Sequence, residues 1–221
     1  YMYCNTEPVG SFQNLLIVAD GMGGHRAGDY ASRLCVETMV QSLEKSAHKT
    51  PVSLFEEAVT AANKAVFEES ASHVEYEGMG TTVVACTLEE NTLYIANIGD
   101  SRLYLIRDGI EQITDDHSLV EEMVKQGNIT ESEARIHPQK NIITRALGIN
   151  EEVQADFFEI DVEQGDVIML CSDGLSNMIE DEDLEYIVKN SDTLQTAAES
   201  LVARANENGG NDNITVVLAE V

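Results

Sequence analysis

Asn14-Leu15-Leu16-Ile17-Val18-Ala19-Asp20-Gly21-Met22-Gly23-Gly24-His25 is the stretch that decides the fold. After Asn14 it is a continuous apolar run of strand length, which is typical of a strand buried on both faces. The run stops at Asp20 and gives way to a loop rich in glycine. The sequence therefore predicts a buried strand that delivers a carboxylate to a sharp turn.

The chain after this loop predicts two helices and then mainly strands. Apolar residues recur at helical spacing over residues 26–44 and 52–70. The β-branched and aromatic runs that follow are interpreted as an antiparallel meander that ends in a hairpin at Asp108-Gly109. The expected strands are residues 81–88, 92–98, 102–106, 110–114, 153–160, 167–171 and 214–221, and two further helices are expected at 182–188 and 193–207. The opening Tyr1-Met2-Tyr3-Cys4 looks like the inside of another strand.

This order of elements favours the α+β class. Strands without alternating helical crossovers indicate two packed antiparallel β-sheets flanked by helices on both outer faces. We expect residues 1–221 to form a single domain, since a chain of this length can bury a large core. The weakly patterned segment at residues 115–145 is interpreted as an insertion, and long irregular segments in compact domains are usually functional.

The composition excludes some classes of function. The formal net charge is −27, with 40 acidic residues against 13 Lys and Arg, so nucleic acid is not an expected partner. Most of the excess is interpreted as a solvated acidic surface. The cysteines Cys35, Cys86 and Cys171 lie in apolar runs and are expected to be reduced and buried in an intracellular protein. No apolar run approaches the length of a membrane span.

Four aspartates each adjoin a predicted strand. Asp20, Asp100 and Asp173 follow apolar runs, and Asp212 precedes one. In antiparallel sheets the end of one strand lies beside the start of its neighbour, so the four carboxylates are expected to converge at one edge. Like charges brought together raise one another's pKa unless a cation separates them. Oxygen ligands favour Mg²⁺ or Mn²⁺ over zinc. Taken singly, each aspartate is better explained by an ordinary turn, and only the four together favour a metal site.

Five ordered motifs together resemble one family. They are Ala19-Asp20-Gly21-Met22-Gly23-Gly24-His25, Gly80-Thr81-Thr82, Ile98-Gly99-Asp100-Ser101-Arg102, Ser172-Asp173-Gly174-Leu175 and Gly210-Asn211-Asp212-Asn213-Ile214-Thr215. Their order and spacing are similar to those of metal-dependent protein phosphatases of type 2C, the PPM family, in its bacterial serine/threonine phosphatase branch. The resemblance extends from Leu15 to the C-terminus.

The resemblance implies a two-metal centre that uses Mn²⁺ or Mg²⁺. Asp20 would bridge the two ions, the Gly21 carbonyl would join one of them, and Asp173 and Asp212 would hold the other. Asp100 matches the family aspartate that, with the one at Asp173, binds a weaker third ion. Residues 115–145 correspond to the family's flap. The family's N-terminal strand, with the arginine that binds the substrate phosphate, would precede Tyr1 and is not in this chain.

The implied reaction is hydrolysis of phosphoserine or phosphothreonine in proteins by a water activated between two divalent metals. No nucleophilic side chain is required. His25 is a candidate to protonate the leaving oxygen or contact substrate, or else it is a surface histidine at the start of a helix. His117 and His137 are expected to be exposed loop residues. Thr81 and Thr82 are expected to pack or to form supporting hydrogen bonds.

Two other classes of function compete with this one. A non-catalytic pseudophosphatase, acting as a binding or regulatory module, would use the same fold. A calcium-binding structural protein is disfavoured, because the aspartates are scattered instead of clustered in one loop. For the enzyme we expect a cytoplasmic monomer that acts on phosphorylated proteins and opposes a cognate Ser/Thr kinase.

Overall fold

The computed structural model describes residues 1–221, apart from the side chain of His25. The strands are β1 (Met2–Asn5), β2 (Leu15–Val18), β3 (Gly21–Met22), β4 (Gly80–Thr81), β5 (Val83–Glu89), β6 (Thr92–Ile98), β7 (Arg102–Ile106), β8 (Ile110–Gln112), β9 (Asp156–Asp161), β10 (Val167–Cys171) and β11 (Val216–Glu220). The helices are α1 (His25–Lys45), α2 (Pro51–Ser72), α3 (Leu119–Lys125), α4 (Glu131–Arg135), α5 (Asp173–Ser176), α6 (Asp181–Lys189) and α7 (Leu194–Glu207), with a short 3-10 turn at Val74–Tyr76.

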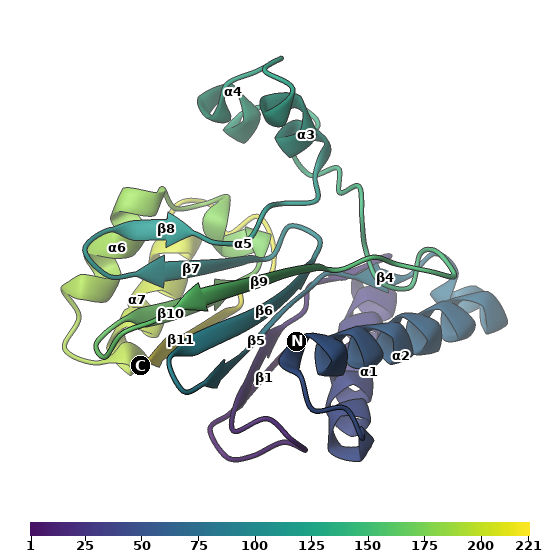
Figure 1. Ribbon diagram of the computed structural model, residues 1–221. Helices are drawn as coiled ribbons and strands as arrows, with labels where there is room; N and C mark the ends of the chain where they lie inside the picture. The colour runs from purple at the N-terminus through teal and green to yellow at the C-terminus, as the bar shows by residue number, and fades with distance from the viewer.

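Two antiparallel sheets form the centre of the molecule (Figure 1). One has the strand order β1-β2-β5-β6-β9, and the other has the order β11-β10-β7-β8. A short ladder of β3 and β4 lies beside them and pairs Gly21 with Thr81. The predicted α+β sandwich is therefore confirmed.

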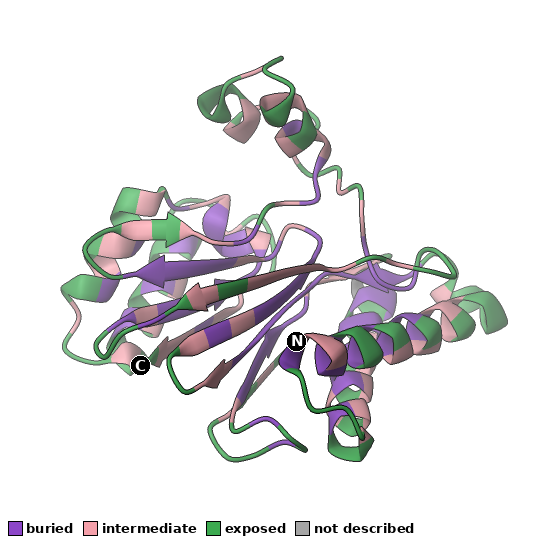
Figure 2. Ribbon diagram, viewed as in Figure 1, coloured by how far each residue is buried: buried purple, intermediate pink, exposed green. Residues whose placement is uncertain are grey.

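Three apolar clusters hold the layers together. In Figure 2 the buried residues are concentrated on the sheets and along one side of the helices that cover them. Helices α1 and α2 pack on the outer face of the five-stranded sheet, where Ile17 and Phe55 are both buried. The two sheets pack through side chains such as Val84 and Leu170. Helices α5, α6 and α7 cover the other sheet through residues that include Leu184. Neighbouring residues of β2 thus enter different clusters, which explains why its sequence is apolar without interruption.

The predicted meander is wrong at one point. Strands β5 and β6 form a hairpin as expected, but β6 then pairs with β9, and β7 lies in the other sheet. The link from β6 to β7 is Gly99-Asp100-Ser101, which is as short as a hairpin loop. Because a link of this length fits either a turn within a sheet or a crossing between stacked sheets, the local pattern does not distinguish the two.

The segment of residues 115–145 projects away from the sheets, with α3 and α4 at its tip (Figure 1). An isolated bridge between Ser118 and Ile143 closes its base. Arg135 of α4 contacts the turn after α5, because its Nη2 donates to the carbonyls of Ser176 and Ile179 at 3.2 Å. The segment is thus joined to the body at its base and through one arginine.

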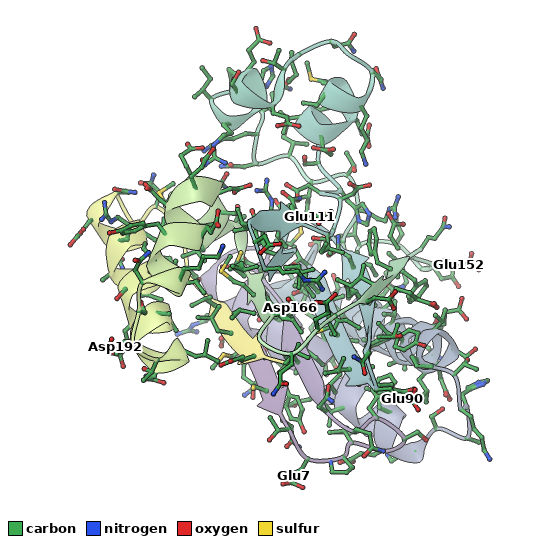
Figure 3. All side chains as sticks on the ribbon, turned by 60° about the vertical axis from the view of Figure 1, so that its left-hand side comes forward. Glu7, Glu90, Glu111, Glu152, Asp166 and Asp192 are labelled. Atoms are coloured by element: carbon green, nitrogen blue, oxygen red, sulfur yellow. The ribbon has the colours of Figure 1, made fainter. Side chains whose placement is uncertain are left out.

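The surface is acidic in many places. Figure 3 shows the exposed carboxylates of Glu7, Glu90, Glu152 and Asp192 on separate parts of the molecule. This distribution agrees with the interpretation of most of the acidic excess as a solvated surface. None of the helices described has the length and hydrophobicity needed to cross a membrane.

Candidate metal centre

Asp20 lies directly beyond the end of β2, where two threonines hold its backbone. The Asp20 amide donates to Thr82 Oγ1 at 3.0 Å. The Asp20 carbonyl accepts from the Thr82 amide at 2.8 Å and from Thr81 Oγ1 at 2.9 Å. Both threonines are buried. The prediction that Thr81 and Thr82 form supporting hydrogen bonds is confirmed, and these bonds fix the position from which the carboxylate extends.

Gly21 lies against the first turns of α1. A Cβ atom at Gly21 would be 1.8 Å from the Gly28 carbonyl oxygen, and a Cβ at Gly28 would be 2.6 Å from the Gly21 carbonyl oxygen. Only two glycines permit this approach, since a real Cβ does not come so close to backbone. The contact fixes the helix relative to the turn after Asp20.

Asp173 and Asp212 lie on two loops that Ser172 joins. The Ser172 amide donates to the Thr215 carbonyl at 3.1 Å, while its Oγ accepts from the Thr215 amide at 3.0 Å and donates to the Asn213 carbonyl at 3.1 Å. Asp173 is half-buried at the start of α5, and Asn177 donates to its Oδ2 at 3.1 Å. Asp212 is exposed, and its Oδ1 accepts from the Asn213 amide at 2.8 Å.

The carboxylates of Asp173 and Asp212 lie close enough to Asp20 to change its ionisation. Burial raises the pKa of Asp20 to about 7, and the charges of Asp173 and Asp212 contribute. Burial also raises the pKa of Asp173, with the charge of Asp212 next in importance. The side chain of Asp173 therefore lies near enough to Asp20 to favour its protonated form. A cation bound between such carboxylates would favour their charged forms.

Asp100 lies on the short link from β6 to β7. Burial raises its pKa to about 7, and the charges of Asp173 and Asp116 add to this effect. The next residue, Ser101, is fully buried, and its Oγ is 2.7 Å from Thr82 Oγ1. Thr82 therefore joins the backbone of Asp20 to the link that contains Asp100.

This donor set fits divalent cations of the Mg²⁺ or Mn²⁺ type, because it offers only oxygen atoms and an excess of negative charge. Among the side chains described, no group of three or more His, Cys, Asp or Glu residues is placed so that it could hold a metal ion. The Gly21 carbonyl is a further oxygen donor on the same turn as Asp20. A cation between Asp20 and Asp173 would relieve the repulsion between their charges.

A pocket of about 530 Å³ adjoins this centre. Asp100 and Asp173 line it on the side of the sheets, and Glu121, Arg135 and Lys140 line it on the side of the 115–145 segment. We call Asp20, Asp100, Asp173 and Asp212 the carboxylate cluster. The pocket therefore lies between this cluster and the projecting segment.

The structure corrects one expectation about the histidines. His117 is only 6% exposed, not an exposed loop residue, because it lies at the base of the 115–145 segment and is hydrogen-bonded on both ring nitrogens. His137 is half-buried in the same segment. His25 is the first residue of α1, and its side chain lies outside what the structure describes.

Ser101, Ser172 and Asn177 are site residues that the sequence analysis missed. Ser101 and Ser172 are each adjacent in sequence to one of the four aspartates, and each is buried and hydrogen-bonded to a neighbouring loop. The sequence signal that could have identified these two serines is their position next to Asp100 and Asp173.

We expect Thr82→Val to weaken Mn²⁺ binding by about 10- to 100-fold, as is usual for residues that orient metal ligands. Valine has the shape of threonine but leaves the Asp20 amide and Ser101 Oγ without this partner. Calorimetric Mn²⁺ titration measures the effect. Thr87→Val is the matched control, because Thr87 is equally buried on β5 and its Oγ1 donates to the Asn14 carbonyl at 2.7 Å instead. Equal Mn²⁺ affinity in the two variants would contradict the expectation.

Comparison with known proteins agrees with this geometry. A family model described as Protein phosphatase 2C matches residues 8–219. The chain is 40% identical over 226 residues to serine/threonine phosphatase stp of Listeria monocytogenes, covering 98% of this chain and 90% of that protein. It is also similar to the crystal structure of serine/threonine phosphatase Stp1 from Staphylococcus aureus, with a TM-score of 0.91, 33% identity, and coverage of 100% and 87%.

A further solved structure is that of the catalytic domain of the serine threonine protein phosphatase PstP in complex with two manganese ions. Its TM-score is 0.84 and its identity is 37%, over 93% of this chain and 86% of that one. The family model matches residues 8–219, which include Asp20, Asp173 and Asp212, and these relatives cover nearly the whole chain. The chain therefore belongs to the protein phosphatase 2C family.

Proposed function

We propose that Asp20, the Gly21 carbonyl, Asp173 and Asp212 hold two divalent metal ions, and that Asp100 with Asp173 holds a weaker third. The observation that supports this most is the convergence of three carboxylates from separate loops: burial raises the pKa of Asp20 to about 7, and the charges of Asp173 and Asp212 add to this effect. Asp212 is exposed on the adjoining loop, where it can turn toward an ion without disturbing the core.

The enzyme is a metal-dependent protein-serine/threonine phosphatase, as its family and its similarity to enzymes of that name indicate. Bound at this centre, two Mn²⁺ or Mg²⁺ ions supply an activated water for attack on phosphorus and neutralise phosphoryl charge. Thr81 and Thr82 hold the turn that presents Asp20, and Ser172 holds the loops of Asp173 and Asp212 in register. The pseudophosphatase alternative is not favoured, because all of the proposed ligands are present.

We propose that the pocket beside Asp100 and Asp173 binds the part of the substrate polypeptide that adjoins its phosphorylated residue. One wall belongs to the 115–145 segment, which we propose acts as a flap over the bound protein. His25, at the start of α1, is our candidate for protonating the leaving oxygen or contacting substrate. The substrates are then phosphorylated proteins. We further propose a cytoplasmic monomer that opposes a cognate Ser/Thr kinase.

We expect the protein to release inorganic phosphate from phosphothreonine peptides when Mn²⁺ is added and to stop when excess chelator is added. Renewed Mn²⁺ should restore the rate, because removal of the ions leaves the carboxylates in place. Equal turnover in excess chelator would contradict the two-metal proposal. A protein that binds Mn²⁺ but remains inert on every phosphopeptide would instead favour the pseudophosphatase alternative.

A further inference from the structure

His117 lies where the 115–145 segment meets the body of the molecule. Its amide donates to the Gly99 carbonyl at 2.9 Å, and its own carbonyl accepts from the Thr144 amide at 2.7 Å. Gly99 directly precedes Asp100. The backbone of His117 thus joins both ends of the projecting segment to the link between the two sheets.

The side chain of His117 makes a second contact with the same glycine. The Gly99 amide donates to His117 Nδ1 at 3.0 Å. A backbone N–H is always a donor, so Nδ1 must be an acceptor and the ring proton lies on Nε2. Nε2 is 2.9 Å from Asp156 Oδ2, to which it donates. The surroundings therefore select a single neutral tautomer.

Asp156 is fixed in turn by Arg145. Arg145 Nη1 donates to Asp156 Oδ1 at 2.7 Å. Burial opposes the charge of Asp156, but the hydrogen bonds from His117 and Arg145 outweigh it and hold its pKa below the ordinary value. Asp156 is the first residue of β9, and Arg145 lies at the end of the 115–145 segment. The chain of contacts runs from the segment through β9 to Gly99.

The backbone of Gly99 is also restricted by its conformation and by the side chain of Thr82. Its φ is +102°, and a Cβ there would lie 2.6 Å from the Thr82 side chain. Thr82 is the residue that bonds the Asp20 amide and Ser101. His117 and Thr82 thus both restrict Gly99, which directly precedes Asp100.

We propose that His117, held as the Nε2–H tautomer by Asp156 and Arg145, is a positioning residue that fixes the Gly99–Asp100 link and ties the 115–145 segment to the carboxylate cluster. Its kinetic consequence rests on the proposed role of that cluster in metal binding. The plainer explanation is a buried histidine that contributes only to stability. The two differ in which ring nitrogen matters for activity.

Amide substitutions separate the two nitrogens. His117→Asn keeps an acceptor near the place of Nδ1 and loses the contact with Asp156, whereas His117→Gln keeps a group near Nε2 and leaves the Gly99 amide without a partner. We expect His117→Asn to retain kcat within about 3-fold and His117→Gln to lose about 10- to 100-fold in kcat, the usual range for residues that orient a metal site. His137→Gln, in the same segment, is the matched control and should retain kcat. Equal rates for His117→Asn and His117→Gln would overturn the proposal.

Asp156→Asn tests the tautomer without altering the histidine. Arg145 will bind the side-chain oxygen of the new asparagine, so its NH₂ group will face His117 Nε2. The ring proton then moves to Nδ1, where it faces the Gly99 N–H and the hydrogen bond between them is lost. We expect a loss of kcat like that of His117→Gln. Long-range ¹H–¹⁵N NMR spectra should show the Nε2–H form of His117 in the unaltered protein and its loss in Asp156→Asn.

An Nδ1–H or doubly protonated His117 in the unaltered protein at neutral pH would overturn the proposal, whether or not the variants fold. This readout needs no turnover. If the unaltered protein were inactive on phosphopeptides with Mn²⁺, the proposed function would fail while the NMR result would still decide the role of His117.

Discussion

Asp20→Asn is expected to lower kcat/KM for phosphothreonine peptides by about 10³-fold, a loss of the size seen when a main electrostatic group is removed from an active site. The neutral amide removes the charge at the contact between Asp20 and Asp173, where we place the metals. Phosphate release at saturating Mn²⁺ measures the loss. Asp192→Asn is the control, because Asp192 is exposed on the turn between α6 and α7 (Figure 3) and is not among the four aspartates. Activity of Asp20→Asn within about 3-fold of the unaltered enzyme, far less than the loss expected for this kind of group, would exclude Asp20 as a ligand.

The same substitution is expected to stabilise the metal-free protein at pH 8. The pKa of Asp20 rises from 3.8 to about 7 on folding, so the folded state binds more protons than the unfolded state between these values. The free energy of unfolding therefore falls as pH rises through this window. One pKa unit corresponds to about 1.4 kcal/mol, and with partial solvent screening we expect a gain of about 1–2 kcal/mol from Asp20→Asn.

Thermal unfolding in chelator, at pH 5 and at pH 8, measures this gain. We expect the unaltered protein to be less stable at pH 8 than at pH 5, and the difference to shrink in Asp20→Asn. A variant no more stable than the unaltered protein at pH 8 would show that burial and the neighbouring carboxylates do not destabilise the charged form of Asp20. Loss of activity together with a gain in stability would identify Asp20 as a group retained for function.

Gly21→Ala is expected to cost about 3 kcal/mol of stability or more, and most of the activity. The new Cβ would lie 1.8 Å from the Gly28 carbonyl oxygen, a backbone atom that cannot move without displacing α1. A loss of this size lowers Tm by about 6–12 °C in a protein of this length. Calorimetry and phosphate release measure the two effects.

Gly109→Ala is the control for this prediction. No atom lies within 4 Å of a Cβ built at Gly109, which occupies the turn between β7 and β8. Its Tm should stay near that of the unaltered protein. A Gly21→Ala variant as stable as Gly109→Ala would show that α1 does not press on the turn after Asp20.

Local pattern was sufficient to predict most elements. Strands β7 and β10 begin and end where their β-branched and apolar runs do, and α1 extends one residue beyond the expected range at each end. The aspartates could be predicted as a group because each adjoins a buried strand. Which strands pair depends on contacts between residues that are far apart in the sequence. The pairing of β6 with β9 could therefore not be predicted from the link after Ile98.

The burial of His117 also could not be predicted from the local sequence pattern. Its ring contacts are Gly99 and Asp156, which are 18 and 39 residues away along the chain. A polar residue in an irregular segment is usually exposed, and only a tertiary contact reverses that expectation. Ser101 and Ser172 were missed for the same reason, since their partners Thr82 and Asn213 are distant in sequence.

The four aspartates come from both sheets, since Asp20 follows a strand of the five-stranded sheet and Asp173 follows a strand of the other. An ion held between them binds the folded chain and has no equivalent site once the sheets separate. Each tenfold rise in free Mn²⁺ above the dissociation constant then adds about 1.4 kcal/mol to the free energy of unfolding. If the proposed ions bind there, we expect loss of Mn²⁺ to raise the fraction of unfolded chains, and with it their exposure to proteolysis.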